Sequence, residues 1–363
     1  MRSIPPGDLI TAPIFPDRRL ERMKLTVLMG GVSEEREVSL ASGAQVARAL
    51  REAGHEVLAV DTSHGALSPA EEEALLGAGI KEPPPPALTR DLLLTGNTGS
   101  LTEDPQIAET DVVFLALHGG SGEDGTIQTL LELAGIPFVG SDRVGCALSM
   151  HKDLSKRLLR DAGVPTPAWI TTRGRDEAIE RLGEIVETLG LPVIVKPPSG
   201  GSTLGLTLAH DEEELLEALD LALDYEEEVL FEAYIVGREL TVGILGEEAL
   251  PVGEIIPEHE LFDYECKYRP GMAQEIFPAD LPPAIASTLQ AAALKAHRAL
   301  RMQDFSRVDF ILDGKGVAWC LEANALPGLT GNSLLPKAAM ASGISFPSLC
   351  DRVAKLALRR VRG

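Results

Sequence analysis

Strand-like and helix-like stretches alternate along the chain from Lys24 onward, and this rhythm limits its folds more than any other feature. Residues 25–29 form a short apolar run, residues 37–53 have a helical pattern that ends at Gly54, and residues 55–60 again favour a strand. Residues 112–117 (VVFLAL) are continuously apolar, which is typical of a parallel strand covered on both faces. The alternation predicts an α/β fold with an open parallel sheet near the N-terminus. Such sheets bind ligands at the carboxyl ends of their strands.

The α/β pattern continues to the end of the chain. The further predicted elements are helices over residues 126–134 and 148–162 and strands over residues 137–139, 191–196 and 228–235. Asp211, with Glu214 three residues later, predicts the start of another helix, because a capping carboxylate accepts the first free backbone N–H groups. Residues 61–111, with four prolines at 83–86, predict a less ordered surface excursion.

Charge and composition argue against several classes of partner. The chain has 363 residues and a net charge of −22, which disfavours nucleic acid or an anionic membrane as the main partner. No apolar run reaches the length of a membrane span, so no membrane insertion is expected. Residues 1–22 lack the apolar core of a secretory signal and predict a loose N-terminal extension, with Met23 as an alternative start. Four separated cysteines without a CxxC pair predict reduced thiols and a cytoplasmic protein.

Residues 307–328 (RVDFILDGKGVAWCLEANALPG) carry the strongest chemical signal and predict two strands around a DGKG turn. Because strand side chains alternate faces, Arg307 and Asp309 share one face, and Glu322 and Asn324 share a face of the returning strand. A four-residue turn places Arg307 opposite Glu322 and Asp309 diagonal to Glu322, roughly 7 Å away. The oxygen donors predict a magnesium site, and the guanidinium suits a phosphate or a developing oxyanion. The alternative is an ordinary hairpin whose charged residues lie on its solvent-exposed face.

Four loops or helix starts carry further candidate ligand contacts. Lys196 enters a loop (KPPSGGSTLG) whose backbone N–H groups can wrap a polyphosphate, and Lys152 opens a helix. Glu35 lies at the start of the first helix, where it can bind an ammonium group, and His118 begins a glycine-dense loop (HGGSGEDG). Each has a plainer interpretation, namely an ordinary turn, a surface lysine, or acids that favour a helix N-terminus electrostatically.

Residues 262–268 (FDYECKY) lie in a polar stretch that continues to Pro278. Such a segment can form a lid that closes over a reacting site. The alternative is a hairpin loop with surface aromatics.

Taken together and in this order, the motifs resemble those of the D-alanine–D-alanine ligases of the ATP-grasp superfamily. The shared motifs are GG-x-S-x-EREVSL, ALHG…GEDG, LPVIVKP, YE-x-KY, R-x-D and EAN…PG, and they span nearly the whole chain from Met23 onward. The resemblance implies a three-domain ATP-grasp fold with ATP held between the central and C-terminal domains. The implied divisions are an extension at 1–22, an N-terminal α/β domain at 23–140, a central domain at 141–232 and a C-terminal catalytic domain at 233–363.

The resemblance also implies a reaction and a set of nucleotide and metal ligands. Two D-alanine molecules would be joined at the expense of ATP, through an acyl phosphate, for peptidoglycan synthesis. Lys152, Lys196, Ser202 and Thr203 would contact the ATP phosphates. Glu232 would meet the adenine amino group, Glu239 the ribose, and the main chain of Ala233 and Ile235 the adenine edge. Two magnesium ions, or manganese in their place, would be held by Asp309, Glu322 and Asn324, with Glu322 bridging them.

The same resemblance implies which residues would hold the amino acids. Glu35 would bind the ammonium of the first D-alanine with His118 nearby, and Glu35, Ser202 and Tyr268 would form a hydrogen-bonded set that closes the lid. Arg307 and the Gly328 N–H would stabilise the tetrahedral intermediate. The second amino acid would be positioned by Lys267, Ser333 and Leu334. Relatives are usually homodimers, so a homodimer is expected.

Two alternatives to this reaction differ in chemistry. In the first, the acceptor is D-lactate, D-serine or another amino acid, although Tyr268 favours an amide product, because depsipeptide-forming relatives often carry histidine there. In the second, the chain is an inactive ATP-binding regulator on the same scaffold. Such a regulator should have lost Arg307, Asp309 or Glu322, and the sequence retains all three.

Overall fold

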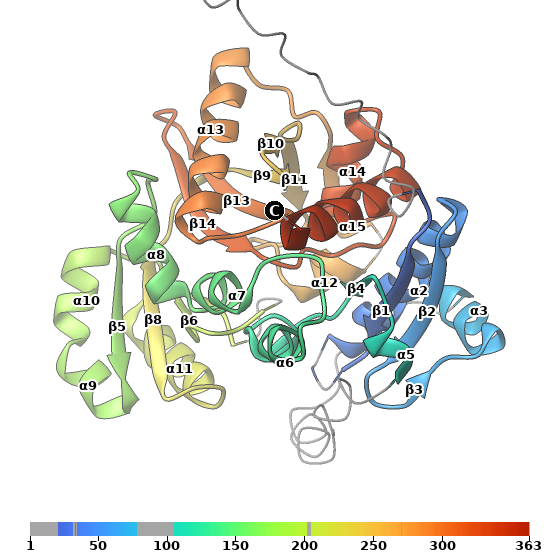
Figure 1. Ribbon diagram of the computed structural model, residues 1–363. Helices are drawn as coiled ribbons and strands as arrows, with labels where there is room; N and C mark the ends of the chain where they lie inside the picture. The colour runs from blue at the N-terminus through green and yellow to red at the C-terminus, as the bar shows by residue number, and fades with distance from the viewer. Residues whose placement is uncertain are drawn as a thin grey trace, which may run out of the picture.

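The computed structural model describes residues 21–31, 33, 35–77, 105–201, 205–269 and 271–362. Three sheets organise these residues, and each lies at the centre of one lobe in Figure 1: a blue N-terminal lobe, a green and yellow central lobe, and an orange and red C-terminal lobe. No helix within this described part combines the length and the apolarity that crossing a bilayer requires.

The N-terminal sheet is built on parallel strands, as the apolar runs predicted. β1 (Lys24–Met29) lies between β2 (Glu56–Asp61) and β4 (Val112–Leu115), and the short β3 (Gly65–Ala66) adds an antiparallel edge. All four residues of β4 are buried, which confirms that both faces of the sheet are covered. The helical segments of this lobe are α2 (Arg36–Glu52), α3 (Pro69–Gly77), α5 (Pro105–Ala108), the 3₁₀ turn η2 (Gly120–Gly122) and α6 (Thr126–Ala134).

Two parts of this lobe differ from the sequence-based prediction. The strand expected over residues 137–139 is reduced to one parallel bridge between Phe138 and Val113. The excursion expected over residues 61–111 is ordered in part, because it contains β3, α3 and α5. The guanidinium of Arg51 donates to both carboxylate oxygens of Glu72, which fixes α3 against α2. Residues 78–104 of this stretch lie outside the described residues.

The central sheet is antiparallel, in the order β5-β8-β6-β7. Its strands are β5 (Trp169–Arg173), β6 (Val193–Lys196), β7 (Thr207–Ala209) and β8 (Glu228–Ala233), and its helices are α9 (Gly174–Glu180), α10 (Leu182–Leu189) and α11 (Glu212–Leu223). Asp211 caps α11 as predicted, because its carboxylate accepts the N–H groups of Glu213 and Glu214, both at 2.9 Å.

The single helix predicted over residues 148–162 is in fact two helices. α7 (Arg143–Met150) ends and α8 (Lys152–Asp161) begins at His151, whose backbone is extended and pairs with Ser199. The N–H of Lys152 donates to the carbonyl of Pro198 at 2.8 Å. These bonds to a distant loop compensate for the interrupted helix, and they fix Lys152 beside the Gly/Ser loop that follows β6.

The C-terminal sheet is antiparallel, in the order β12-β11-β9-β13-β14, with β10 paired to β9. Its strands are β9 (Gly237–Leu245), β10 (Glu248–Ala249), β11 (Gly253–Pro257), β12 (Ala273–Ile276), β13 (Phe305–Asp313) and β14 (Ala318–Asn324), and its helices are α12 (Tyr264–Tyr268), α13 (Pro283–Ala299), α14 (Leu334–Ala341) and α15 (Phe346–Arg362). Val308 and Phe310 point into the core with Leu289 of α13. The intervening Asp309 therefore faces the opposite side of the sheet.

The β13–β14 hairpin confirms the two predicted strands, but the predicted register is wrong. Arg307 pairs with Asn324 instead of Glu322, and Asp309 lies directly opposite Glu322 instead of diagonal to it. Leu312 pairs with Ala318, so the connection between the paired positions is one residue longer than expected, and a β-bulge after Asp309 adds a second shift. Directly opposed residues have Cβ atoms about 4.5–5.5 Å apart, so the two carboxylates lie closer together than predicted.

The C-terminal helix returns to the N-terminal lobe and joins it to the C-terminal sheet. Apolar residues of α15 share one core with β1 and β4. Arg360 donates to the carbonyl oxygens of Phe138 and Gly140 at 2.8 and 2.7 Å, and its guanidinium pairs with Asp304 at 2.8 Å. These contacts hold the N-terminal and C-terminal lobes together.

Candidate active site

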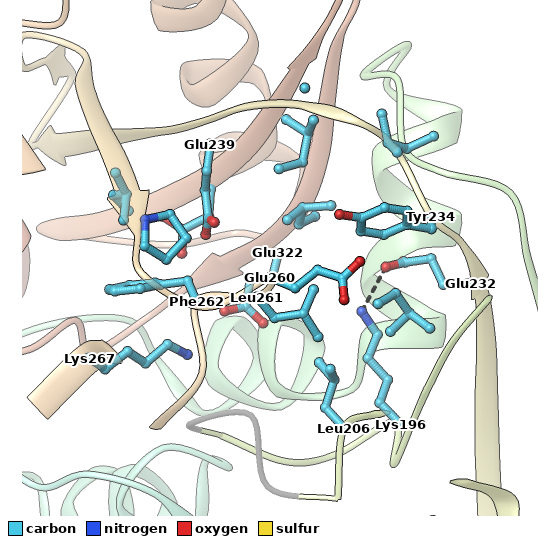
Figure 2. A pocket seen from close by; sticks show the side chains of 18 of the residues that line it. Lys196, Leu206, Glu232, Tyr234, Glu239, Glu260, Leu261, Phe262, Lys267 and Glu322 are labelled. Carbon is cyan, nitrogen blue, oxygen red and sulfur yellow. Dashed lines mark hydrogen bonds and ion pairs between the residues drawn. The ribbon is translucent and has the colours of Figure 1, made fainter. Parts of the chain in front are cut away.

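A cavity of about 460 Å³ lies between the central and C-terminal sheets. Figure 2 shows Lys196 and Glu232 on its central side, Glu239 and Glu322 on its C-terminal side, and Phe262 and Lys267 from the lid segment. Its lining includes six of the residues predicted to bind ATP: Lys152, Lys196, Glu232, Ala233, Ile235 and Glu239. The other two, Ser202 and Thr203, lie outside the described residues. A cavity lined by both apolar and charged side chains suits a planar ring that carries a polyanion.

A buried lysine that the sequence analysis missed lies behind one wall of this cavity, where it pairs with the lining residue Glu232. Lys156 is 1% exposed, and its Nζ lies 2.5 Å from one carboxylate oxygen of Glu232, while Lys196 lies 2.8 Å from the other. Burial acts to raise the pKa of Glu232, but the two lysines outweigh it and lower that pKa to about 2. Glu232 is therefore ionised and holds Lys196 in place. The signal in the sequence was the i, i+4 spacing of Lys152 and Lys156, which puts both on one face of α8.

Lys152 lies beside the Gly/Ser loop that follows β6. Its Nζ donates to the carbonyl oxygen of Gly200 at 2.5 Å. Burial lowers its pKa, while the charge of Glu322 acts in the opposite direction. Lys152 and Lys196 thus approach the cavity from α8 and β6, two elements that the break at His151 brings together.

Three carboxylates meet on the cavity face of the C-terminal sheet. Asp309 lies across from Thr241 on one side and Glu322 on the other, and Glu239 lies two residues before Thr241 on β9. Burial, followed by the charges of Asp309 and Glu322, raises the pKa of Glu239 to about 7. Burial acts to raise the pKa of Asp309 also, but Arg307 outweighs it and the net shift is downward.

Arg307 holds Asp309 in a bidentate pair. Its Nη2 lies 2.8 Å from one carboxylate oxygen and its Nε lies 3.0 Å from the other. Thr241 Oγ1 donates to the same carboxylate at 2.7 Å. The side chains of Arg307 and Asp309 are only 11% and 10% exposed, so this pair is shielded from water and fixed in direction.

The donor set fits a divalent cation. Asp309 and Glu322 present carboxylate oxygens from opposed positions, and Asn324 presents an amide oxygen two residues along β14. Hard cations such as Mg²⁺ take oxygen ligands of this kind. Burial raises the pKa of Glu239, and the charges of Asp309 and Glu322 add to this effect. A cation bound among these carboxylates would neutralise that negative charge.

A second cavity, of about 570 Å³, adjoins the first and lies between the N-terminal lobe, the lid and the C-terminal sheet. Phe262, Lys267 and Glu322 line both cavities. The second cavity brings together most of the residues predicted to contact amino acids or the intermediate: Glu35, His118, Lys267, Arg307, Gly328, Ser333 and Leu334. Asn324 lines it as well.

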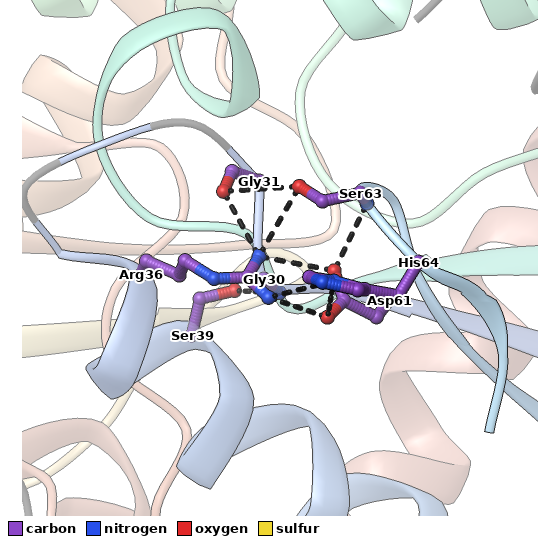
Figure 3. A network of polar contacts seen from close by, with 7 residues as sticks. All are labelled: Gly30, Gly31, Arg36, Ser39, Asp61, Ser63 and His64. Carbon is purple, nitrogen blue, oxygen red and sulfur yellow. Dashed lines mark hydrogen bonds and ion pairs between the residues drawn. The ribbon is translucent and has the colours of Figure 1, made fainter. Parts of the chain in front are cut away.

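The loop that carries Glu35 is fixed by the polar network in Figure 3. Arg36 donates to the carbonyl of Gly31 and pairs with Asp61 at 2.5 Å, and the hydroxyl of Ser39 accepts the N–H of Gly30 at 2.8 Å. A Cβ at Gly30 would lie 2.4 Å from Asp61, so only glycine fits beside this ion pair. The Glu35 side chain reaches the Gly/Ser loop after β6, since a Cβ built on Gly201 would lie 2.9 Å from its Oε2.

His118 is oriented by two side chains, neither of which was predicted as a site residue. Its Nε2 lies 3.1 Å from the Ser42 hydroxyl and its Nδ1 lies 3.5 Å from Glu123. Burial and the charge of Glu35 raise the pKa of Glu123, although its bond to His118 opposes them. Glu123 belongs to the same glycine-dense loop as His118, and that shared loop was the available signal.

The far end of the second cavity is formed by the turn before α14. Ser333 accepts the N–H of Thr330 at 3.1 Å, and a Cβ at Gly328 would lie 3.0 Å from the Ser333 hydroxyl. The N–H of Gly331 donates to Gln45 at 2.8 Å, which ties this turn to α2. Leu334 begins α14 and is 7% exposed.

The lid segment lies over the junction of the two cavities. Its helix α12 carries Lys267, whose Nζ lies 5.7 Å from the centre of the Phe262 ring. Tyr268 ends α12, and its side chain lies outside the described residues. The predicted set of Glu35, Ser202 and Tyr268 therefore stays a prediction.

Two family models match most of the chain. Residues 24–141 match the D-ala D-ala ligase N-terminus, and residues 158–355 match the D-ala D-ala ligase C-terminus. A D-alanine--D-alanine ligase of Desulfotalea psychrophila is 39% identical over 357 residues, which cover 96% of this chain and 98% of the relative. A D-alanine--D-alanine ligase of Aquifex aeolicus is 40% identical over 328 residues, which cover 90% and 98%.

Solved structures give the same likeness in three dimensions. D-alanine--D-alanine ligase from Bacillus anthracis complexed with ATP aligns with a TM-score of 0.74 and 30% identity, over 94% of this chain and 99% of that one. VanG D-Ala:D-Ser ligase from Enterococcus faecalis aligns with a TM-score of 0.77 and 30% identity, over 93% and 99%.

Proposed function

The chain belongs to the D-alanine–D-alanine ligase family of ATP-grasp enzymes, and we propose that it joins two D-alanine molecules with ATP in the two adjoining cavities. The products are D-alanyl-D-alanine, ADP and phosphate, and the dipeptide serves peptidoglycan synthesis. One observation carries this proposal most directly. Glu322 and Lys267 line both cavities, so a phosphoryl group from the first can reach a carboxylate in the second.

The nucleotide is proposed to lie between the central and C-terminal sheets. The main chain of Ala233 and Ile235 takes the adenine edge, and Glu239 takes the ribose. Lys152 and Lys196 bind the phosphates, because both ammonium groups line the cavity beside the phosphate loop. The predicted contact of Glu232 with adenine stays a proposal, and its two ion pairs give it a second role, which is to position Lys196.

Replacing Lys156 by methionine tests this positioning. Glu232 would keep its ion pair with Lys196 but lose the one with Lys156. The free energy of unfolding should therefore fall by about 3 kcal/mol, which is the lower end of the range for a broken buried ion pair. Lys196 should then shift toward Glu232, and a loss of about 1.4 kcal/mol in nucleotide binding would raise KM for ATP roughly tenfold. Denaturant unfolding and steady-state kinetics measure the two effects.

Lys315→Met is the matched control, because Lys315 is exposed at the tip of the β13–β14 hairpin. It should change stability by no more than about 0.5 kcal/mol. A Lys156→Met enzyme with unchanged stability and unchanged KM would contradict the proposed role of Lys156.

Asp309, Glu322 and Asn324 are proposed to hold two Mg²⁺ ions, with Glu322 between them, and Mn²⁺ suits the same donors. Bound there, Mg²⁺ would screen the negative charge of the transferred phosphoryl group. Hydrogen bonds from Arg307 and Thr241 fix the orientation of the Asp309 carboxylate for metal binding.

The first D-alanine is proposed to bind with its ammonium group at Glu35, near His118, and its carboxylate toward Glu322. That carboxylate attacks the γ-phosphoryl group of ATP to give an acyl phosphate and ADP. The chain contributes mainly positioning and cationic groups to this step, since Lys152 and Lys196 meet the phosphates.

The second D-alanine is proposed to bind near Ser333, Leu334 and Lys267. Its neutral amine attacks the acyl phosphate, and Arg307 with the Gly328 N–H stabilises the oxyanion that develops. Phosphate then leaves and the amide forms. An acyl phosphate would hydrolyse in open water, so closure of the lid around α12 is part of the reaction.

Purified protein with ATP, Mg²⁺ and D-alanine tests the proposed reaction. We expect phosphate release that depends on D-alanine, together with the dipeptide in equal amount. D-serine and D-lactate should be compared as acceptors across pH, because an amine must lose a proton to react and a hydroxy acid need not. Phosphate release no higher than without D-alanine would refute the proposal, and a preference for D-lactate would refute the amide product.

We further propose that the enzyme works in the cytoplasm as a homodimer. The four cysteines are free and buried, which suits a reducing compartment. The domain boundaries at 22/23, 140/141 and 232/233 also stay proposals, although the three sheets take their strands from residues 24–115, 169–233 and 237–324.

A further inference from the structure

The lid carries a group of side chains that the ligase reaction does not use. His259, Asp263 and Cys266 surround the start of α12, and one potential ligand atom from each lies within 4.8 Å of the others. They are the imidazole, carboxylate and thiol of a mixed N/O/S set. In the described residues, no other group of three or more histidine, cysteine, aspartate or glutamate side chains is as close.

Hydrogen bonds already join the His259 and Asp263 side chains to each other and Asp263 to the backbone of Cys266. His259 Nδ1 lies 2.7 Å from Asp263 Oδ2, and Asp263 Oδ1 accepts the N–H of Cys266 at 2.9 Å. The Cys266 thiol also shares a hydrogen bond with the Asp263 side chain. A metal ion binds imidazole, carboxylate and thiol ligands by displacing the protons that they carry.

The surroundings favour a cation and allow it to enter. The side chains of His259 and Asp263 are 38% and 40% exposed, so the group opens to solvent, whereas Cys266 forms its buried side. Glu258 and Glu265 add negative charge next to His259. The group thus combines two solvent-exposed ligands, a buried thiol and acidic neighbours.

We propose that His259, Asp263 and Cys266 form a binding site for a thiophilic divalent cation such as Zn²⁺, separate from the magnesium donors on the C-terminal sheet. Zinc takes thiolate, imidazole and carboxylate ligands at about 2.0–2.3 Å, so a tetrahedral site has ligand atoms about 3.5 Å apart. Rotamer shifts of about 1 Å bring the present atoms to that spacing. Water fills the fourth position.

A metal bound there restrains the lid. The site joins His259, which follows β11, to Cys266 within α12, and the next residue is Lys267, which lines both cavities. Lid opening accompanies substrate entry and product release in enzymes of this kind.

Cobalt titration of the full-length protein, with Mg²⁺ in excess, tests the site. Co²⁺ substitutes for Zn²⁺ and gives a thiolate-to-cobalt absorption band that oxygen ligands cannot produce. We expect this band to saturate at one equivalent and to disappear when Zn²⁺ is added. Removal of an outer partner of a metal ligand costs about 10–100-fold in affinity, so His259→Ala, which removes a ligand, should weaken Co²⁺ binding at least tenfold.

Two cysteine substitutions complete the test. Cys266→Ser keeps the size of the side chain and should abolish the band, whereas Cys350→Ala, in the buried core around α15, should leave it unchanged. Absence of the band in the unsubstituted protein overturns the proposal, as does its persistence in Cys266→Ser or at full strength in His259→Ala. Because the band reports binding and not turnover, its absence leaves the proposed ligase reaction unaffected.

Discussion

Glu322→Gln is expected to abolish turnover while ATP still binds weakly. Glu322 lies directly opposite Asp309 and lines both cavities, so it is the carboxylate best placed to bridge two cations. The amide keeps the shape of the side chain but loses its charge and one acceptor oxygen. Charge stabilisation by a metal is worth several kcal/mol, which corresponds to a loss of about 10³-fold or more in kcat. Phosphate release at saturating ATP and D-alanine measures it.

The matched control is Glu248→Gln, the same substitution at an exposed residue of β10 in the same sheet. It should leave kcat unchanged. Isothermal titration with ATP and Mg²⁺ then separates binding from chemistry, because Glu322→Gln should retain measurable nucleotide affinity. Activity within a few-fold of the unsubstituted enzyme would show that the metal ions are held elsewhere.

Arg307→Ala is expected to lower kcat on the order of 10²-fold or more, as the loss of an oxyanion donor does in other enzymes. The guanidinium lines the second cavity and is fixed by its bidentate pair with Asp309, so its direction depends on that pair. The substitution also leaves Asp309 buried without its cation. Stability should therefore fall by about 3–5 kcal/mol, and denaturant unfolding in the absence of substrate measures that effect.

Arg307→Lys distinguishes the two roles of this side chain. Lysine keeps the positive charge beside Asp309 but cannot form a planar bidentate pair, so stability should recover more than kcat does. Arg298→Ala is the control, since Arg298 forms an exposed pair with Glu247 that contributes little. If Arg307→Ala lost stability but retained kcat in the folded fraction, the oxyanion donor would have to be another group.

The β13–β14 hairpin illustrates how far local sequence patterns reach. Alternation of apolar and charged residues predicted the strands, and the DGKG sequence predicted the turn. The register depended on one extra turn residue and on the bulge after Asp309, neither of which the pattern specifies. The chemistry assigned to Asp309 and Glu322 did not require the correct register, because both side chains face the cavity in either case.

Lys156 and Glu123 show what such patterns miss. Lys156 lies on an amphipathic helix, where a lysine is normally exposed, and only the packing of α8 against β8 brings it to Glu232. Glu123 follows three glycines in a loop whose path depends on contacts with α2 and α6. Burial gives both residues their importance, and burial of a polar group is a property of the assembled lobes.

The sequence by itself determined many of the helices and strands, the α/β class and the kinds of chemical group available, because backbone propensity, side-chain alternation and turn chemistry act over a few residues. The tertiary structure alone decided that α8 breaks at His151, that Lys156 and Lys196 share one carboxylate, and that two cavities adjoin at Glu322. These features arise where segments that are far apart in the chain pack against each other and exclude water. The strength of charge pairs and the direction of side chains change there in ways that no local pattern records.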